Sequence, residues 1–233
     1  MVIGTESRPV LLRWSVAVGQ AYQDSYALFS ARGQSLIDPA LPDASSRFAL
    51  ERYFYDYPVA TLLTSAWHER AAYEVRGAYG VPVWSPEAGK AEMEGRPDHL
   101  FTAGDKLPCG VEAIAIDEGF AGDSALLWEA PGGAKVLFTG DAVMGGLDPD
   151  ATASDHWRRQ PGLYAYMHGE PDPERFRRSL GHLLNYDFDI LCSAHSPPVA
   201  DRPKESLARL LADPDARFVR VFDGVGLIGS DRK

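Results

Sequence analysis

The spacing of hydrophobic and polar residues changes along the chain, and each change marks a predicted element. Runs rich in β-branched and aromatic residues, bounded by glycine or proline, predict strands. In the first half of the chain these are residues 8–18, 25–31, 35–39, 59–64 and 81–84. Apolar residues at helical spacing predict helices at 45–55 and 68–79, and the polar run 87–97 is predicted to be an exposed connection or short helix.

The second half also consists of strands followed by helices. Strands are predicted at residues 112–116, 124–130, 135–139, 188–192 and 218–227. Amphipathic helices are predicted at 173–186 and 203–211. Because several connections, such as the one at 131–133, are too short for parallel crossovers, the pattern favours two stacked sheets with helices outside over a Rossmann sheet. The predicted fold class is therefore α+β.

Length and charge narrow the class of protein. A chain of 233 residues, 45% hydrophobic, can bury one large core, so a single domain over residues 1–233 is expected. Its formal charge of −10 disfavours nucleic acid as a partner, because the repulsion between polyanions acts over a long range. No apolar run approaches the ~18 residues that a bilayer span requires, so no membrane partner is expected.

Cysteine usage bears on the cellular setting. Cys109 and Cys192 lie far apart in the sequence and outside any Cys-x-x-Cys pattern. The first residues include an acidic side chain and lack the apolar core of a secretory signal. A reduced, cytoplasmic setting with structural thiols is the prediction, while pairing of the two cysteines stays open.

One short segment carries a chemical signal. The apolar residues Leu137 and Phe138 run into Thr-Gly-Asp, so a strand delivers the carboxylate of Asp141 to a fixed point at its end. Taken alone, Asp141 could equally cap the segment after its strand, which is a common role for aspartate. His195, in a loop after a predicted strand, could likewise be a buried histidine with structural hydrogen bonds. Neither residue by itself identifies a site.

Four segments together resemble the metallo-β-lactamase superfamily, over the stretch from Ser25 to Val199. Residues 35–40 resemble its early Asp-Pro-Gly turn, and residues 64–70 stand in the position of its Thr-His-x-His-x-Asp-His signature. Residues 138–142 match its later strand ending in Gly-Asp, and residues 193–199 resemble its terminal Gly-His-Gly-x-Pro segment. The resemblance implies an αββα sandwich of two mixed β-sheets with helices outside, in which Asp38 orients the metal-binding loop.

Most metal ligands of that family are replaced in this sequence. Ser65 and Trp67 stand where the first two histidines of the signature belong, Glu69 replaces the aspartate, and Arg70 replaces the third histidine. Phe120 takes the place of a further ligand. A hydroxyl and two aromatic rings cannot replace imidazoles as zinc ligands. We therefore expect one half of a dinuclear site to be lost, with Trp67 and Phe120 as core aromatics that fill the vacated space.

The other half of the site is the candidate active site that the resemblance implies. Glu69, Asp141 and His195 would supply three ligands and leave an open position, which suits a catalytic zinc, manganese or iron ion. His68, one residue from an expected histidine, is an alternate ligand. Arg70 opposes metal binding, because a guanidinium where an imidazole normally points would repel a cation. The surrounding pocket would be lined by Ser65, Trp67, His68, Arg70 and Phe120.

Two functions follow from the resemblance, and the sequence leaves both open. In the first, the protein is a hydrolase with at most one divalent metal, with Glu69, Asp141 and His195 as catalytic residues, and a water attacks an ester, thioester or lactone carbonyl. In the second, no metal binds, and an ion pair between Arg70 and Asp141 occupies the old cavity of a ligand-binding or assembly protein. β-Lactam cleavage is not expected, because the two-metal ligand set is absent.

A small-molecule ligand or substrate is the expected partner. Aromatic and arginine side chains at 155–159 and 164–168 could line a pocket for a partly anionic molecule, or could form a solvated surface. Leu163 and Tyr166 are candidates for a homodimer contact.

Overall fold

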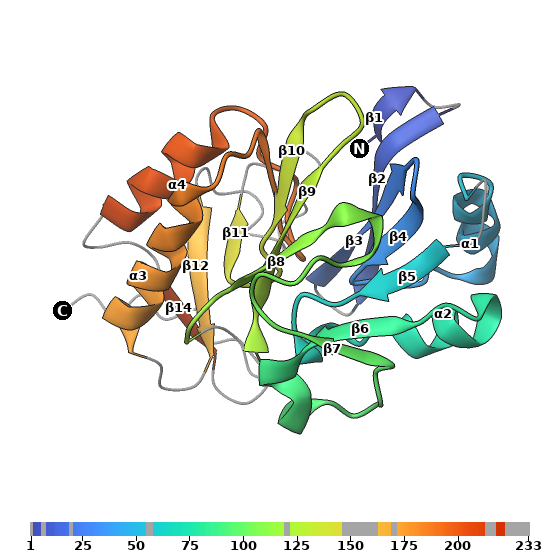
Figure 1. Ribbon diagram of the computed structural model, residues 1–233, viewed down its shortest axis with the longest axis horizontal. Helices are drawn as coiled ribbons and strands as arrows, with labels where there is room; N and C mark the ends of the chain where they lie inside the picture. The colour runs from blue at the N-terminus through green and yellow to red at the C-terminus, as the bar shows by residue number, and fades with distance from the viewer. Residues whose placement is uncertain are drawn as a thin grey trace.

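Two mixed β-sheets form the centre of the molecule (Figure 1). The computed structural model describes residues 2–5, 8–18, 21–54, 58–118, 122–145, 163–168, 172–212 and 218–221. The larger sheet has seven strands in sequence order, antiparallel from β1 to β4 and parallel from β4 to β7. Its strands are β1 (Val2–Thr5), β2 (Arg8–Val18), β3 (Ala21–Ser30), β4 (Gly33–Ile37), β5 (Pro58–Leu62), β6 (Val83–Pro86) and β7 (His99–Phe101).

The second sheet has four strands in the order β13-β10-β9-β8. These are β8 (Glu112–Ala115), β9 (Ser124–Glu129), β10 (Lys135–Phe138) and β13 (Ile190–Cys192). β10 is antiparallel to β9 and parallel to β13, so β10 and β13 end at the same edge of the sheet. A third, three-stranded sheet contains β11 (Val143–Gly145), β12 (Leu163–His168) and β14 (Phe218–Val221).

The longer helices lie in two pairs on opposite sides of the sheets, α1 with α2 and α3 with α4 (Figure 1). They are α1 (Ala44–Glu51), α2 (Ala72–Tyr79), α3 (Pro173–His182) and α4 (Pro203–Ala212). Short 3-10 helices are η1 (Ala66–His68), η2 (Glu87–Glu92), η3 (Pro108–Gly110) and η5 (Leu183–Asn185). Among the described residues, no helix has the length and apolar character needed to cross a membrane.

Helix ends follow local sequence signals. Asp172 caps α3, because its carboxylate accepts hydrogen bonds from the backbone N–H groups of Glu174 and Arg175. Pro173 occupies the first turn, where its missing N–H costs no hydrogen bond. α2 ends at Gly80, which adopts a left-handed φ of 68° that favours glycine.

The main core lies between the two sheets. Tyr26 and Leu28 of β3 belong to the same buried cluster as Leu126, Trp128 and Phe138 of the second sheet. The rings of Tyr26 and Phe138 contact edge to face, with centroids 5.1 Å apart. Each large apolar side chain buried in this way contributes about 1.5 to 3 kcal/mol to folding.

Alternate residues of the same strands supply two outer cores. Ala125 and Leu137 of the second sheet pack with Phe176 of α3 and Leu207 of α4. On the other side of the molecule, Ala27 and Leu36 of the seven-stranded sheet pack with Leu50 of α1 and Val75 of α2. Because side chains alternate between the two faces of a strand, strands that are buried on both faces are continuously apolar. The layers are therefore helix, sheet, sheet, helix, as the sequence predicts.

The structure corrects the predicted helix over residues 68–79. It divides this segment into η1 and α2, which are separated by residues 69–71. Arg70 has a φ of 37°, a left-handed conformation that a continuous right-handed helix cannot contain. The backbone N–H of Ala71 instead donates to the carbonyl oxygen of Pro39, 3.0 Å away, which ties the break to the loop after β4.

Other differences concern short strands and one surface prediction. The hydrophobic pattern does not predict β1, β7 or β11, which are too short to show a period, nor β12. Residues 222–227 of the last predicted strand lie outside the described residues. Leu163 is buried with the core between the second sheet and α3, so it is not exposed for the predicted homodimer contact. The side chain of Tyr166 lies outside what the structure describes.

Candidate functional site

Loops at the ends of parallel strands bring the candidate residues together. Asp38 follows β4, the segment from Thr64 to Arg70 follows β5, Asp141 follows β10, and His195 follows β13. β4 is parallel to β5, and β10 is parallel to β13. Within each sheet the two loops therefore leave from the same edge, which places side chains distant in sequence close together.

Asp141 lies between two imidazoles. Its Oδ2 is 3.3 Å from Nε2 of His68, and its Oδ1 is 3.2 Å from Nε2 of His195. The ligand atoms of these three residues all lie within 4.8 Å of one another. No other set of three or more histidine, cysteine or acidic side chains in the described part of the chain is close enough to hold a metal ion. We call His68, Asp141 and His195 the His-Asp-His cluster.

The second ring nitrogen of each histidine is held from outside the cluster. Nδ1 of His68 lies 3.0 Å from Oδ2 of Asp38 and 2.8 Å from Oγ1 of Thr64. Nδ1 of His195 lies 2.6 Å from the carbonyl oxygen of Tyr22, which can only accept, so this Nδ1 donates. When Nδ1 carries the proton, a neutral ring presents the lone pair of Nε2 to the centre of the cluster.

Asp38 also fixes the segment that carries His68. Its Oδ1 accepts from the backbone N–H of Thr64 at 2.8 Å, and its Oδ2 accepts from the Thr64 hydroxyl at 2.6 Å. Both side chains are buried, so these hydrogen bonds do not compete with water. Asp38 thus orients the loop after β5, as expected from the sequence.

Charges within the cluster shift the pKa values of its members. Burial alone would lower the pKa of His68, but the carboxylates of Asp38 and Asp141 outweigh burial and raise this pKa to about 9. Burial would raise the pKa of Asp141, but His195 and His68 outweigh burial and hold it well below its usual range. The pKa of Asp38 is lowered in the same way, by His68 and Arg70 against burial. Both carboxylates are therefore ionised at neutral pH.

The donor set fits a divalent metal ion. Nε2 of His68 and Oδ1 of Asp141 are buried, and among the described residues neither atom makes a well-aligned hydrogen bond beyond its contact of 3.3 or 3.2 Å within the cluster. Unsatisfied buried polar atoms are costly, and two of them at the centre of one cluster leave donor atoms available for a cation. Two imidazoles with one carboxylate are ligands that zinc, manganese and iron accept. His195, whose side chain is 21% exposed, marks the most open side of the cluster.

Glu69, predicted as a ligand, does not join the cluster. Its carboxylate accepts from the Tyr73 hydroxyl at 2.6 Å and from the backbone N–H groups of Glu94 and Gly95 at 2.7 and 2.9 Å. Burial and this hydrogen bond raise the pKa of Tyr73, so the hydroxyl stays protonated and donates. Two of the three donors belong to the loop after η2 and the third belongs to α2, so these hydrogen bonds hold Glu69 away from the cluster, which is the physical reason that the sequence-based assignment fails.

The contact between Tyr73 and Glu69 predicts the effect of a change at Gly95. A Cβ on residue 95 would lie 2.0 Å from Cε2 of Tyr73, so the ring must move and lose its hydrogen bond to Glu69. We expect Gly95→Ala to lower the free energy of unfolding by about 1 to 3 kcal/mol in urea denaturation. Gly77→Ala is the control, because a Cβ there meets nothing within 4 Å and alanine favours the helix. Unchanged stability of Gly95→Ala would contradict this role of Glu69.

Arg70 and Trp67 also differ from expectation. The ion pair of Arg70 with Asp141 is not formed. The guanidinium donates to three backbone carbonyl oxygens, and the charged groups of the described residues within ion-pair distance of Asp141 are those of His68 and His195. Trp67 does not fill a vacated core, because it is 44% exposed and its indole N–H donates to Glu92 at 2.9 Å. The η1 turn leaves Trp67 at the surface and buries His68 instead.

The remaining pocket predictions have mixed outcomes. Ser65 is buried, and its hydroxyl has no hydrogen-bond partner among the described residues. Phe120 and residues 155–159 lie outside the described residues, and of 164–168 only the backbone and the side chain of Ala165 are described.

Sequence reasoning missed the carbonyl of Tyr22 as a partner of His195, since no side-chain pattern signals a backbone acceptor. The sequence feature that points to His68 as a ligand is that it is the single histidine among residues 64–70.

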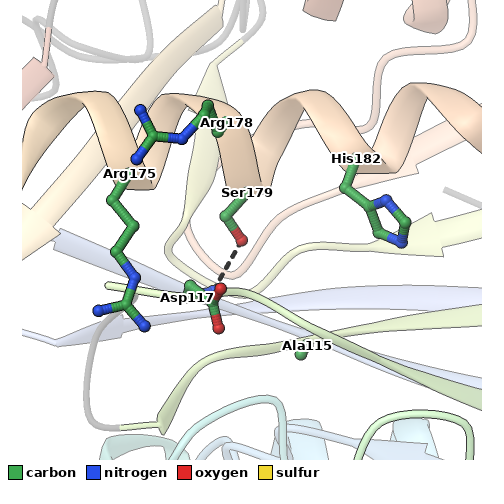
Figure 2. Close-up of a pocket in the computed structure, with 6 residues that line it drawn as sticks. All are labelled: Ala115, Asp117, Arg175, Arg178, Ser179 and His182. Atoms are coloured by element: carbon green, nitrogen blue, oxygen red, sulfur yellow. Dashed lines mark hydrogen bonds between the residues drawn. The ribbon is translucent and has the colours of Figure 1, made fainter.

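A hollow of about 500 Å³ elsewhere is a weaker candidate site. It is lined by Ala115, Asp117, Arg175, Arg178, Ser179 and His182 (Figure 2). Figure 2 shows the guanidinium groups of Arg175 and Arg178 pointing in different directions rather than toward one point. Arg175 already pairs with Glu118 at 2.9 Å. The hollow therefore lacks the convergent polar groups of a ligand site.

Comparison with known proteins identifies the fold. The sequence matches no protein-family model and no curated protein. Its structure is similar to metallo-β-lactamase family protein TTHA1429 from Thermus thermophilus, with 20% identity, a TM-score of 0.61, and coverage of 87% of this chain and 78% of that chain. It is similar to a metallo-β-lactamase from Hirschia baltica, with 12% identity, a TM-score of 0.58, and coverage of 86% of this chain and 92% of that chain.

A third similar structure was solved with metal. It is TTHA1623 in a di-iron-bound form, with 20% identity, a TM-score of 0.57, and coverage of 84% of this chain and 97% of that chain. Together these likenesses show that the chain has the metallo-β-lactamase fold, an αββα sandwich.

Proposed function

We propose that the protein is a hydrolase-like enzyme of the metallo-β-lactamase fold that uses one divalent metal ion, held by His68, Asp141 and His195. One observation carries the proposal. Both imidazoles are held at Nδ1 by outer acceptors, so both Nε2 atoms converge on a buried, ionised carboxylate. Metal-binding histidines in proteins have this outer partner, which fixes the tautomer and orients the ring.

The chain's own residues define what such a site can do. A divalent metal bound there would polarise a carbonyl group and lower the pKa of a water molecule. Asp141 supplies the negative charge that favours a cation, and the buried Asp38 and Thr64 hold His68 against rotation. The more exposed His195 leaves one side accessible to a small molecule. An ester, thioester or lactone is the proposed substrate, because its carbonyl carbon is open to attack by water.

The number and kind of metal follow from the donors. We propose a single ion, because Ser65 and the surface residue Trp67 offer no imidazole for a second. Zinc, manganese and iron all accept two nitrogens and one oxygen, so the donor set does not select among them. The di-iron-bound form of TTHA1623 supports testing iron together with zinc and manganese.

The test is metal loading of the purified protein. We expect wild type to bind about one equivalent of zinc, manganese or iron(II), to gain thermal stability on loading, and to hydrolyse at least one member of an ester, thioester and lactone panel. His195→Ala should lose both the binding and the thermal shift. His182→Ala is the matched control, because His182 is an exposed histidine that contacts Asn185 and Tyr186 outside the cluster. Absence of stoichiometric metal from wild type after loading with all three ions counts against the proposal.

A metal-free binding protein is the second candidate, and one observation favours it. Asp38, His68, Asp141 and His195 form a chain of alternating carboxylates and imidazoles that ends at the carbonyl of Tyr22. The pKa of His68, raised to about 9, makes its ring a cation that could take the place of the ion. On this alternative, His68 rather than Arg70 is the positive partner of Asp141. A wild type that is stable without metal and binds none supports it.

We also propose a reducing, cytoplasmic setting. Cys109 and Cys192 are both free and buried, as expected of structural thiols. The sulfur of Cys109 lies 3.1 Å from the hydroxyl of Ser35, so this thiol packs as part of the interior. The proposed partner in that setting is a small-molecule substrate.

A further inference from the structure

The guanidinium of Arg70 joins three segments around the His-Asp-His cluster. Its Nη1 donates to the carbonyl oxygens of Asp24 at 2.8 Å and Asp38 at 2.9 Å, and its Nη2 donates to the carbonyl oxygen of Ala194 at 3.4 Å. These oxygens belong to β3, to the loop after β4 and to the loop after β13. Arg70 itself lies in the loop after β5, so one side chain connects four separate parts of the chain.

Each of these carbonyls is close to a group that holds the cluster. Asp24 follows closely after Tyr22, whose carbonyl oxygen accepts from Nδ1 of His195. Asp38 holds His68 through its carboxylate. Ala194 directly precedes His195, and its carbonyl oxygen also accepts from the N–H of Asp24 at 2.7 Å. Movement of any of the three segments would therefore displace an imidazole or its outer partner.

We propose that Arg70 is the positioning residue of the site: by binding these three carbonyl oxygens it sets the orientation of both imidazoles. The inference rests on the proposed function in that the imidazoles are taken as metal ligands. It goes beyond that function because it gives Arg70, which stands at the position of a histidine ligand in the family signature, a role in holding the imidazoles of His68 and His195.

The chemistry of arginine suits this role. Guanidinium is planar and rigid, carries five N–H donors, and keeps its charge at every pH at which proteins fold. It can therefore satisfy several carbonyl oxygens at once from a fixed direction. Lysine could reach one or two of the same oxygens, because its ammonium donates from a single point on a flexible stem.

Two effects of Arg70 on metal binding oppose each other. The direction in which metal affinity changes when Arg70 is replaced therefore tests the inference. A fixed positive charge near the cluster repels a cation, so charge alone predicts tighter metal binding when Arg70 is removed. Positioning predicts weaker binding, because the imidazoles lose their orientation. A purely structural role predicts lower stability with unchanged affinity of the molecules that remain folded.

The experiment measures the zinc dissociation constant by competition with a chromophoric chelator, at a temperature at which each variant is folded. We expect Arg70→Met to bind zinc about 10- to 100-fold more weakly than wild type, the range found for loss of an outer-shell partner, and Arg70→Lys to fall between the two. Arg76→Met is the matched control, since Arg76 also donates to a backbone carbonyl, that of Arg96, but belongs to α2 and not to the site. Zinc binding by Arg70→Met that equals or exceeds wild type overturns the inference.

A second readout does not require metal. In metal-free wild type, the Nδ1 proton of His195 should give a protected downfield proton resonance in NMR, because it is hydrogen-bonded to a carbonyl oxygen. We expect this resonance to be lost in Arg70→Met, to be weakened in Arg70→Lys, and to persist in Arg76→Met. If wild type binds no metal, the proposed function fails, but this comparison still decides the role of Arg70. The same resonance in folded Arg70→Met and wild type would exclude positioning.

Discussion

Replacing Asp38 by alanine is expected to lower the free energy of unfolding by about 3 to 5 kcal/mol, the typical cost of removing one partner of a buried ion pair. Asp38 is 2% exposed and accepts from the backbone and the hydroxyl of Thr64 as well as facing His68. Its removal takes this acceptor from three buried groups: the backbone N–H of Thr64, the hydroxyl of Thr64 and Nδ1 of His68. Urea denaturation of the metal-free protein measures the change.

The control for this prediction is Asp98→Ala. Asp98 also accepts a backbone hydrogen bond, from Val83 at 2.9 Å, and pairs with Arg76 at 3.3 Å, but its side chain is 38% exposed. Water can replace its contacts, so we expect a loss of about 1 kcal/mol. Asp38→Asn should fall between the two, because an amide keeps one acceptor for Thr64. Equal losses for Asp38→Ala and Asp98→Ala would mean that the buried network does not stabilise the fold.

Changing Asp141 to asparagine is expected to have the largest effect on metal binding. The amide keeps the shape of the side chain but removes the only negative charge among the three proposed ligands. We expect zinc affinity to fall by more than the roughly 100-fold that marks the upper range for outer-shell changes. Isothermal titration of the metal-free variant with zinc, compared with wild type, measures this loss.

The same variant separates the two candidate functions. In metal-free protein, Asp141→Asn removes the charge of the carboxylate that faces both His68 and His195, while Asp38 stays beside His68, so stability should fall by about 1 to 3 kcal/mol whether or not the protein is a metalloenzyme. Only the metalloenzyme loses, in addition, the thermal shift that metal gives to wild type. Asp189→Asn is the control, because Asp189 is exposed and accepts a hydrogen bond from the backbone of Lys135. Full metal affinity in Asp141→Asn would remove Asp141 from the ligand set.

The candidate site shows where sequence reasoning stops. Asp141 and His195 were assigned to the site through the resemblance of their segments to a known family, and the structure adds that they follow the parallel strands β10 and β13, which end at one edge. His68 was named as an alternate ligand, but the sequence could not choose between it and Glu69, because the backbone conformation between two adjacent residues decides which side chain points toward the cluster. The left-handed φ of Arg70 and the hydrogen bonds of Glu69 to the loop after η2 decide that direction. Neither leaves a periodic signal in the sequence.

The sequence by itself determined the layers of this protein, because alternation and helical spacing dictate which faces must be buried, and burial is the dominant favourable term in folding. It also determined that carboxylate and imidazole donors survive at the ends of β10 and β13. Only the tertiary structure decided which side chain completes the cluster and what Arg70 binds. Those outcomes depend on contacts with backbone carbonyl and N–H groups, which every residue carries and which no pattern of side chains can specify.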